Sequence, residues 1–232
     1  MANVWVVDSN CFIHIGSMAR EGFLDDLNKV LKSSETSLYV TPGVHDEVRT
    51  VRFQRWKGQP NLLEKMQNTL VTVSVDEAEV RALARHIGEK ASPQDVDLSL
   101  MILGSKLAHE GNKVTLVSDD YKMTTTGEKA NLIFETCPPS TFLQRLANMG
   151  SKSQSSRFRS LSRRVRAAEM RYAISRAGQY DIQSKLTWMV DSLISSKPAF
   201  SEDREELSQS DEAKLVSALI RSIRGERVKK SM

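Results

Sequence analysis

The chain has 232 residues, which is enough for one domain of ordinary size and additional material beside it. Charged residues make up 27% of the sequence and hydrophobic residues 40%, proportions that exclude a largely disordered chain and a membrane-embedded one. The formal net charge of +4 makes the protein mildly basic, which favours a polyanionic partner.

The two cysteines, Cys11 and Cys137, lie far apart in the sequence and form no CxxC pair. They therefore support neither a disulfide framework nor a cysteine-rich zinc site. No segment reaches the ~20 apolar residues of a membrane span, and the chain enters a strand-like run at once. We expect a reduced, cytoplasmic location and no membrane partner.

Strand-like and helix-like segments alternate through the first 150 residues. Short runs rich in β-branched residues predict strands at 4–7, 38–40, 71–75, 113–118 and 132–135. Amphipathic or apolar segments predict helices at about 11–32, 42–56, 76–87, 93–107 and 140–147. This alternation predicts an α/β domain with a mostly parallel sheet.

From residue 151 the composition changes, and no later segment has the pattern of a strand. Residues 151–156 are polar and are typical of a linker. Apolar residues at spacings of three and four then predict helices at about 158–172, 182–193 and 215–223. We therefore divide the chain into a domain at 1–150 and a basic, all-helical extension at 151–232, which forms a bundle of its own or packs on the domain.

Acidic residues stand at the predicted strand ends and helix starts. Asp8 follows the first strand, Asp119 and Asp120 follow the fourth, and Glu47 and Asp97 lie on helices that can point back to the same edge. Crowded carboxylates repel one another unless a cation neutralises them, and hard oxygen ligands suit Mg²⁺ or Mn²⁺. The sequence thus predicts a divalent-metal site of the kind used in phosphoryl transfer.

Five segments in this order resemble the PIN-domain ribonucleases: Asp8-Ser9-Asn10, Thr41-Pro42 with Glu47-Val48, Asp97-Leu98-Ser99, Ser118-Asp119-Asp120-Tyr121, and Cys137-Pro138-Pro139-Ser140-Thr141-Phe142-Leu143. The resemblance spans roughly residues 3–148. It implies a three-layer PIN-like fold with Mg²⁺ or Mn²⁺ as cofactor. It also implies an endoribonuclease in which a metal-activated water attacks phosphorus and leaves a 5′-phosphate and a 3′-hydroxyl.

The same resemblance assigns roles to individual residues. Catalysis and metal binding fall on four carboxylates: Asp8, Glu47, Asp97 and Asp120. Supporting positions around the metal fall on Ser9, Asn10 and Ser118. Two further acids stay open as ligands: Asp119, and Asp95, for which a place in a helix-capping box is at least as good an explanation.

Two basic segments are candidates for RNA binding. The first follows Glu47 and mixes cations with a ring that can stack on unpaired bases: Arg49, Arg52, Arg55, Trp56 and Lys57. The second lies in the first helix of the extension, where arginines suit bidentate phosphate contacts: Arg157, Arg159, Arg163, Arg164, Arg166 and Arg171. Ordinary helices with solvated basic faces remain the alternative for both.

Three groups within the resembled family differ in what accompanies the domain. The endonucleases that mature the 3′ end of small-subunit ribosomal RNA are closest in motif but carry a zinc ribbon, for which this chain lacks the cysteines. The small protein-only RNase P group, which trims tRNA, has its helical projection inserted within the domain. Toxin-type ribonucleases usually consist of the domain alone.

We therefore expect a metal-dependent endoribonuclease of RNA processing that acts on an rRNA or tRNA precursor. Ribosomal particles are further candidate partners, and a homodimer is a candidate assembly. The alternatives are a catalytically inactive PIN-like protein that binds RNA or serves as a scaffold in ribosome assembly, and a toxin-type ribonuclease.

Overall fold

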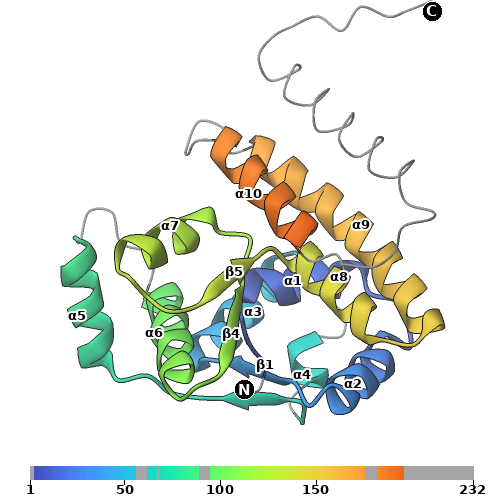
Figure 1. Cartoon of the computed structure of the whole chain (residues 1–232), viewed down its shortest axis with the longest axis horizontal. Helices are drawn as coiled ribbons and strands as arrows, with labels where there is room; N and C mark the ends of the chain where they lie inside the picture. The colour runs from blue at the N-terminus through green and yellow to red at the C-terminus, as the bar shows by residue number, and fades with distance from the viewer. Residues whose placement is uncertain (1–2, 56–61, 67, 89–94, 176–181, 196–232) are drawn as a thin grey trace, which may run out of the picture.

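The computed structural model describes residues 3–55, 62–66, 68–88, 95–175 and 182–195 (Figure 1). Its centre is a five-stranded sheet in the order β3-β2-β1-β4-β5, and all four strand pairings are parallel. The strands are β1 (Asn3–Val7), β2 (Ser37–Val40), β3 (Leu70–Thr72), β4 (Lys113–Val117) and β5 (Glu135–Cys137). This sheet confirms the predicted α/β class.

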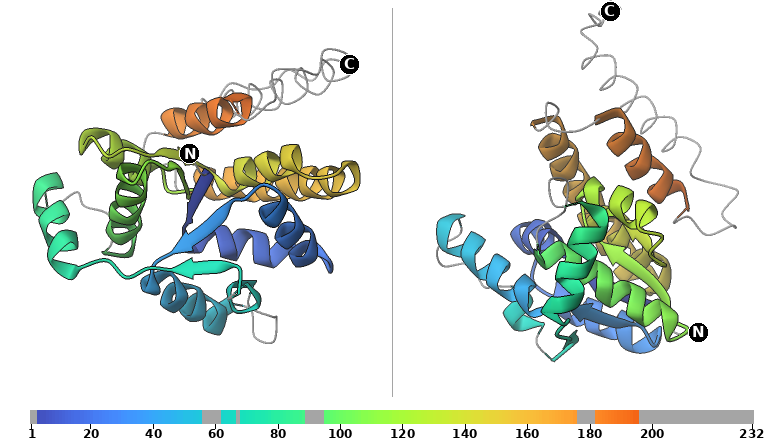
Figure 2. Two further views of the ribbon diagram at one scale, coloured as in Figure 1. Left: turned by 60° about the horizontal axis from the view of Figure 1, so that its bottom comes forward. Right: turned by 90° about the vertical axis from the view of Figure 1, so that its left-hand side faces the viewer.

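Helices cover both faces of the sheet, which gives three layers (Figure 2). α6 packs across β1 and β4 on one face, while α1, α2, α8 and α9 pack together on the other. The described helices are α1 (Ser9–Met18), α2 (Phe23–Ser33), α3 (Pro42–Arg55), α4 (Leu62–Lys65), α5 (Glu77–Ile87), α6 (Asp95–His109), α7 (Tyr121–Lys129), α8 (Pro139–Met149), α9 (Lys152–Ser175) and α10 (Ile182–Ser195).

α9 packs on the domain and shares its core. Phe158, Leu161 and Val165 are buried in the same hydrophobic cluster as β1 and β4. α9 begins at Lys152, so the prediction of a linker at 151–156 was wrong. The hydroxyl of Ser155 donates to the carbonyl oxygen of Ala147, which attaches this first turn to the end of α8.

The remaining sequence expectations for the extension fall in two groups. α10 is present close to the predicted segment 182–193. The predicted helix at 215–223 lies outside the described residues. Within the described chain, no helix combines the length and apolar character required to cross a membrane.

Candidate active site

Asp8 lies at the carboxyl end of the central strand β1 and begins helix α1. Its backbone is extended, with φ of −79° and ψ of 157°, and its N–H donates to the carbonyl oxygen of Val117 at 3.0 Å. This bond fixes Asp8 between the ends of β1 and β4. The Asp8 side chain makes no capping bond to its own helix and is only 1% exposed. Its carboxylate is therefore available to other groups at this edge of the sheet.

Three neutral side chains donate hydrogen bonds to the Asp8 carboxylate. The Ser118 hydroxyl donates to Oδ2 at 2.7 Å, the Ser9 hydroxyl to Oδ1 at 3.1 Å, and the Asn10 amide to Oδ2 at 3.3 Å. These are the three residues that the sequence placed around the metal. They position the carboxylate without adding a positive charge.

Burial raises the pKa of Asp8 to about 6 from a usual value of 3.8. The hydrogen bond from Ser118 opposes this shift, while the negative charges of Asp119 and Glu47 add to it. The two charges that most affect the pKa of Asp8 are thus both negative. A carboxylate in these surroundings favours either a proton or a cation.

Glu47 lies on α3, close enough for its charge to act on Asp8, and the first turn of α3 is packed closely against α6. The methyl Cγ2 of Val96 lies only 2.7 Å from where a Cβ on Gly43 would stand, so glycine is required for this approach. The Ser99 hydroxyl donates to Thr41 Oγ1 at 2.9 Å, which ties the first turns of α6 to the end of β2. The start of α6 therefore lies at the carboxyl edge of the sheet, beside α3.

The two acids at the start of α6 differ in exposure. Asp97 is half-buried, whereas Asp95 is exposed. The capping box would pair Asp95 with Ser92 as the N-cap of the helix, and Ser92 lies outside the described residues, so this alternative stays a prediction. Asp97 stays a predicted ligand, on a helix whose first turns adjoin β2.

The adjacent acids Asp119 and Asp120 occupy different environments. Asp120 is the N-cap of α7, where its Oδ1 accepts from the N–H of Lys122 at 2.8 Å. Asp119 is 2% exposed, its Oδ2 lies 3.0 Å from Nε2 of His14, and its charge raises the pKa of Asp8. Asp120, which the sequence favoured as the ligand, therefore caps a helix. Asp119, which the sequence left undecided, is the one whose charge acts on Asp8.

Three residues were not recognised as part of a site from sequence: His14, which contacts Asp119, and Glu169 and Lys185, whose charges act on His14. His14 on α1 contacts Asp119, and hydrogen bonding to Asp119 raises the pKa of His14 although burial opposes it. Glu169 on α9 is 0% exposed, and Lys185 on α10 is 2% exposed. Glu169 falls four residues after Val165, on the buried face of α9. A glutamate at that position of an apolar stripe was the signal available in the sequence.

The donor types at this edge fit a hard divalent cation. Asp8, Asp119 and Glu47 supply carboxylate oxygens, and their mutual repulsion is the condition that a cation relieves. Within the described part of the chain, however, no three His, Cys, Asp or Glu side chains already lie together as a metal site.

The first basic segment is only partly described. Arg49 is exposed on α3, and Arg52 and Arg55 lie in the same helix. Trp56 and Lys57 lie outside the described residues, so their role in stacking or phosphate contact stays a prediction.

The arginines of α9 have different surroundings. Arg157 forms a two-pronged ion pair with Asp26 of α2, with Nε–Oδ2 at 2.6 Å and Nη2–Oδ1 at 2.7 Å. Arg163 and Arg171 are exposed, whereas three others are half-buried: Arg159, Arg164 and Arg166. Arg157 is therefore paired with α2, and the other exposed arginines, Arg163 and Arg171, are the better placed for RNA.

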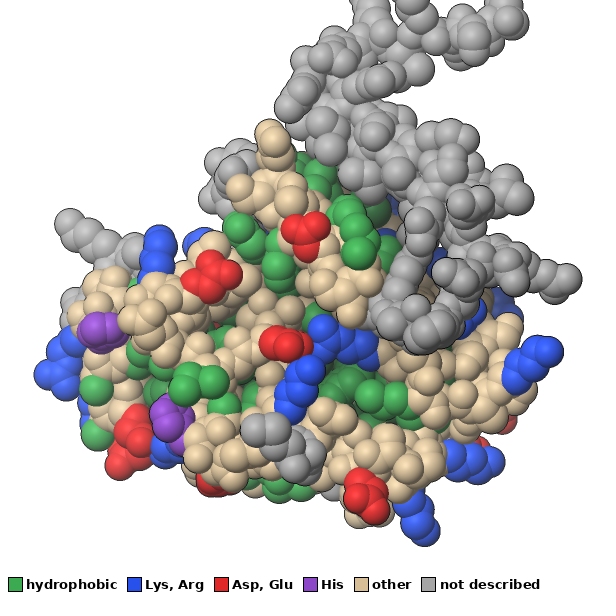
Figure 3. All heavy atoms as spheres, viewed as in Figure 1, with side chains coloured by type: hydrophobic (Ala, Val, Ile, Leu, Met, Phe, Trp, Pro, Cys, Tyr) green, Lys and Arg blue, Asp and Glu red, His purple; other side chains and the backbone are tan. Residues whose placement is uncertain are grey.

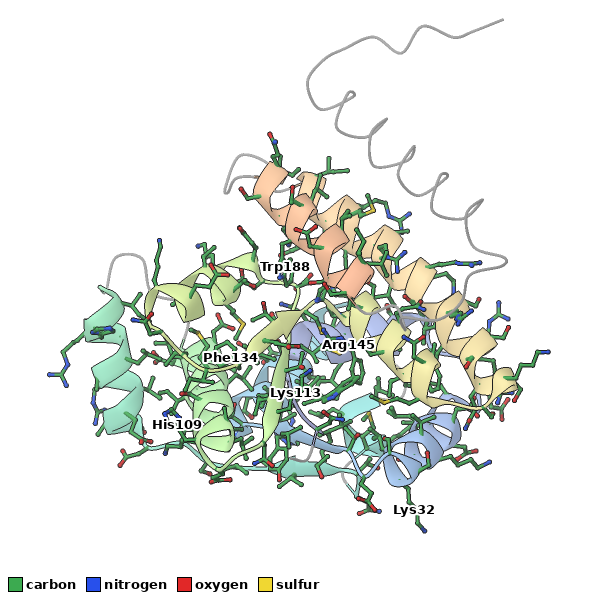
Figure 4. All side chains as sticks on the ribbon, in the orientation of Figure 1. Lys32, His109, Lys113, Phe134, Arg145 and Trp188 are labelled. Atoms are coloured by element: carbon green, nitrogen blue, oxygen red, sulfur yellow. The ribbon has the colours of Figure 1, made fainter. Side chains whose placement is uncertain are left out.

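A separate cleft of about 1200 Å³ lies between the edge strand β5 and the helices α7, α8 and α10. Trp188, Phe134, Arg145 and Lys113 surround it (Figure 4). The Glu135 carboxylate lies 3.7 Å from the Lys113 ammonium and 3.4 Å from the Arg145 guanidinium. Acidic, basic and hydrophobic side chains mix on this face (Figure 3), and the lining includes none of the predicted metal ligands.

Comparisons with known proteins add little to this geometry. No protein-family model and no curated protein matches the chain. A solved structure of VapBC2 from Rickettsia felis, bound to a DNA fragment from its promoter, is similar at 16% identity and a TM-score of 0.41. The similarity covers 57% of this chain and 98% of that chain. At this level it carries no argument about activity, and the fold class rests on the sheet itself.

Proposed function

We propose that the chain is a PIN-type, metal-dependent endoribonuclease. The observation that carries this proposal is the fully buried Asp8 carboxylate, held by three neutral donors and faced by the charges of Asp119 and Glu47. A structural acid is normally paired with a cation or left in water, because uncompensated burial is costly. The resemblance in motif order supports the choice of reaction.

Asp8, Glu47 and Asp119 would hold Mg²⁺ or Mn²⁺, with Asp97 as a further candidate. The ion would supply an activated water and stabilise charge on the leaving oxygen. Ser118, Ser9 and Asn10 keep the Asp8 carboxylate in a fixed orientation. By this proposal, Asp120 serves the helix start of α7 rather than the metal.

The substrate proposed is an rRNA or tRNA precursor. Support comes from the basic character of the chain and from Arg49, Arg163 and Arg171, which are exposed on α3 and α9. Arginine can contact phosphates in two places at once, which suits folded RNA. Single-stranded cleavage sites within such RNA would enter at the carboxyl edge of the sheet.

The proposal is tested by incubating the full chain with end-labelled single-stranded RNA in Mn²⁺, Mg²⁺ or EDTA. We expect cleavage with either ion, products that carry 5′-phosphates, and no cleavage in EDTA. The Asp8→Asn variant should bind the same RNA and leave it intact. Cleavage by Asp8→Asn equal to that of the original chain would refute the assignment.

A second candidate function is an inactive PIN-like module that binds RNA or acts as a scaffold. It is favoured by the absence, among the described side chains, of a group of three ligands already in place. RNA binding without metal-dependent cleavage under all of these conditions would establish it.

A further inference from the structure

The cleft beside β5 has no part in the proposed reaction, because none of the proposed metal ligands lines it. Its lining includes Glu135 and Thr136 of β5, and β5 stands last in the strand order β3-β2-β1-β4-β5. β4 pairs with one side of β5, and no strand of the described chain pairs with the other side. The cleft therefore lies along an edge of the sheet, where a strand has backbone N–H and C=O groups free to pair with another chain.

Helix α10 faces β5 from the other side of the cleft, beyond the edge of the sheet (Figure 2). Its buried residues, among them Leu186 and Met189, lie on the opposite side of the helix, and α10 packs on α8 and α9. The α10 residues that line the cleft and are not buried recur at the spacing of one helix face: Gln183, Ser184, Thr187, Trp188, Asp191 and Ser195. This face is about 18 Å long. An extended peptide between the two walls can thus pair its backbone with β5 and pack its side chains on α10.

Aromatic rings supply apolar surface inside the cleft. The Trp188 ring of α10 lies 5.8 Å from the Tyr121 ring of α7, centroid to centroid, at an angle of 48°. Phe134, which lies directly before β5, also lines the cleft (Figure 4). Aromatic residues are enriched in protein–protein interfaces, where each ring buries a large area. These rings therefore offer anchoring points for the apolar side chains of a partner.

The charges around the cleft favour a basic peptide over RNA. Among the described residues, its lining carries three acids, Glu128, Glu135 and Asp191, and two cations, Lys113 and Arg145. Both cations lie near Glu135, at 3.7 Å and 3.4 Å, whereas Glu128 and Asp191 are exposed and form no ion pair with a described residue. An RNA strand would bring a negative charge with each phosphate to a lining that has more acids than cations. A Lys or Arg side chain would instead be attracted by Asp191 or Glu128.

We propose that the cleft binds an extended, basic segment of a partner protein, which adds to the sheet as a strand beside β5. Backbone hydrogen bonds to β5 supply affinity for any extended segment, and the side chains of α10 and α7 select among segments. Trp188 and Tyr121 pack against an apolar side chain of the partner, and Asp191, one turn of α10 after Trp188, attracts a Lys or Arg. The inference goes beyond the proposed nuclease and gives α10 a role in binding a protein, whether or not the chain cuts RNA.

Variants of the full chain separate this cleft from the rest of the surface. Trp188→Ala removes a ring from the cleft, and Asp191→Lys reverses a charge at an exposed position of α10. Glu110→Lys reverses a charge at an exposed glutamate after α6, which does not line the cleft, and serves as the matched control. The probe is a phage-displayed library of short random peptides, because the partner is defined by its chemistry alone.

We expect peptides selected on the original chain to be rich in Lys or Arg and to carry apolar residues at alternate positions. Their affinity should fall about thirtyfold in Trp188→Ala and about fivefold in Asp191→Lys, and it should be unchanged in Glu110→Lys. In synthetic copies of these peptides, methylation of single backbone nitrogens should weaken binding about tenfold at every second position and little at the positions between. The reason is that only alternate N–H groups of a strand face its neighbour.

Several results would overturn the inference. Selection of no peptide, of peptides without an excess of Lys and Arg, or of peptides that bind Trp188→Ala and Asp191→Lys as tightly as the original chain would each do so. Equal sensitivity to methylation at all positions would show that the peptide does not add as a strand. If single-stranded oligouridine displaces the peptides and itself loses affinity in Trp188→Ala, the cleft takes RNA and not protein. None of these measurements depends on RNA cleavage, so failure of the nuclease proposal leaves the inference to be decided separately.

Discussion

Acidic side chains have opposite electrostatic surroundings at the carboxyl edge of the sheet and in the cleft beside β5. At the edge, Asp8 is buried and its strongest charged neighbours are also acids. In the cleft, Glu135 is about half exposed and lies near two cations, Lys113 and Arg145. The cleft thus contains the acid that is paired with cations, and the buried edge contains the acid that is not.

This difference shows why a cleft is by itself a poor guide to chemistry in this protein. Ion pairs near solvent cost little to form and contribute little, so Glu135 needs no function to explain it. A buried acid beside other acids lowers stability, and such positions are typical of functional sites. Substitutions at the two kinds of acid test whether the two regions differ in this way.

The largest expected effect is at Asp8. Asp8→Asn should reduce RNA cleavage by about 10³-fold or more, because the amide is a poor ligand for a divalent cation. The same variant should be more stable than the original chain at pH 8, by up to about 3 kcal/mol, since the pKa of Asp8 is raised from 3.8 to about 6. Chemical denaturation at pH 8 and RNA cleavage assays measure the two changes.

The combination of lost activity and gained stability is the informative result. A variant that loses both activity and stability would mean that Asp8 is a structural residue, and the contrast with Glu135 would disappear.

The next largest effect concerns Glu169 and pH. Burial raises the pKa of Glu169 from 4.5 to about 7, so its proton is held more tightly in the folded state. The resulting stabilisation is fully present below about pH 4.5 and is lost as the pH rises to about 7. Glu169→Gln should remove this dependence and stabilise the chain by up to about 3 kcal/mol at pH 8.

Melting temperatures of the two proteins between pH 5 and pH 8 check this sign. Parallel pH profiles for Glu169→Gln and the original chain would show that the carboxyl is not buried as described.

A packing change should affect the edge without touching an acid. Gly43→Ala places a Cβ 2.7 Å from Val96 Cγ2, and such overpacking typically costs about 1–3 kcal/mol. We expect lower stability and weaker cleavage, because α3 and α6 carry Glu47 and Asp97. The double variant Gly43→Ala, Val96→Ala removes the clashing methyl groups and should recover most of the loss; no recovery would place the strain elsewhere.

The alternation of strands and helices made most of the fold predictable from sequence. Four strands lie close to their predicted places, whereas β5 (Glu135–Cys137) shares only Glu135 with the predicted segment 132–135. After α7 the chain turns at Asn131, whose φ is 52°, before it enters β5. A pattern of β-branched residues does not reveal such a turn. The linker prediction at 151–156 was wrong because these polar residues form the first turns of α9. The helix is held on the domain by the apolar residues that follow them, which the polarity of the segment does not reveal.

The candidate site was predictable where its residues fall in motifs of the resembled family, which include Ser118, 110 positions from Asp8. Asp8-Ser9-Asn10 is a local motif, and its three side chains do meet. His14 and Asp119, which contact each other, are 105 positions apart in the sequence. Glu169 lies on a third element, α9. Such meetings depend on tertiary packing. The spacing of the apolar stripe on α9 could indicate that Glu169 is buried, but not which residues it would lie near.

The smallest expected effect is at Glu135 in the cleft. Its contacts with Lys113 and Arg145 are long and exposed, so Glu135→Gln should change the free energy of unfolding by less than about 0.5 kcal/mol. Cleavage should be unchanged, because the cleft contains none of the proposed metal ligands. A large loss of cleavage in this variant would mean that the cleft, rather than the buried edge, receives the RNA. Glu135, the acid paired with cations, would then be the functional one. An exposed acid beside cations would in that case indicate substrate binding in this chain.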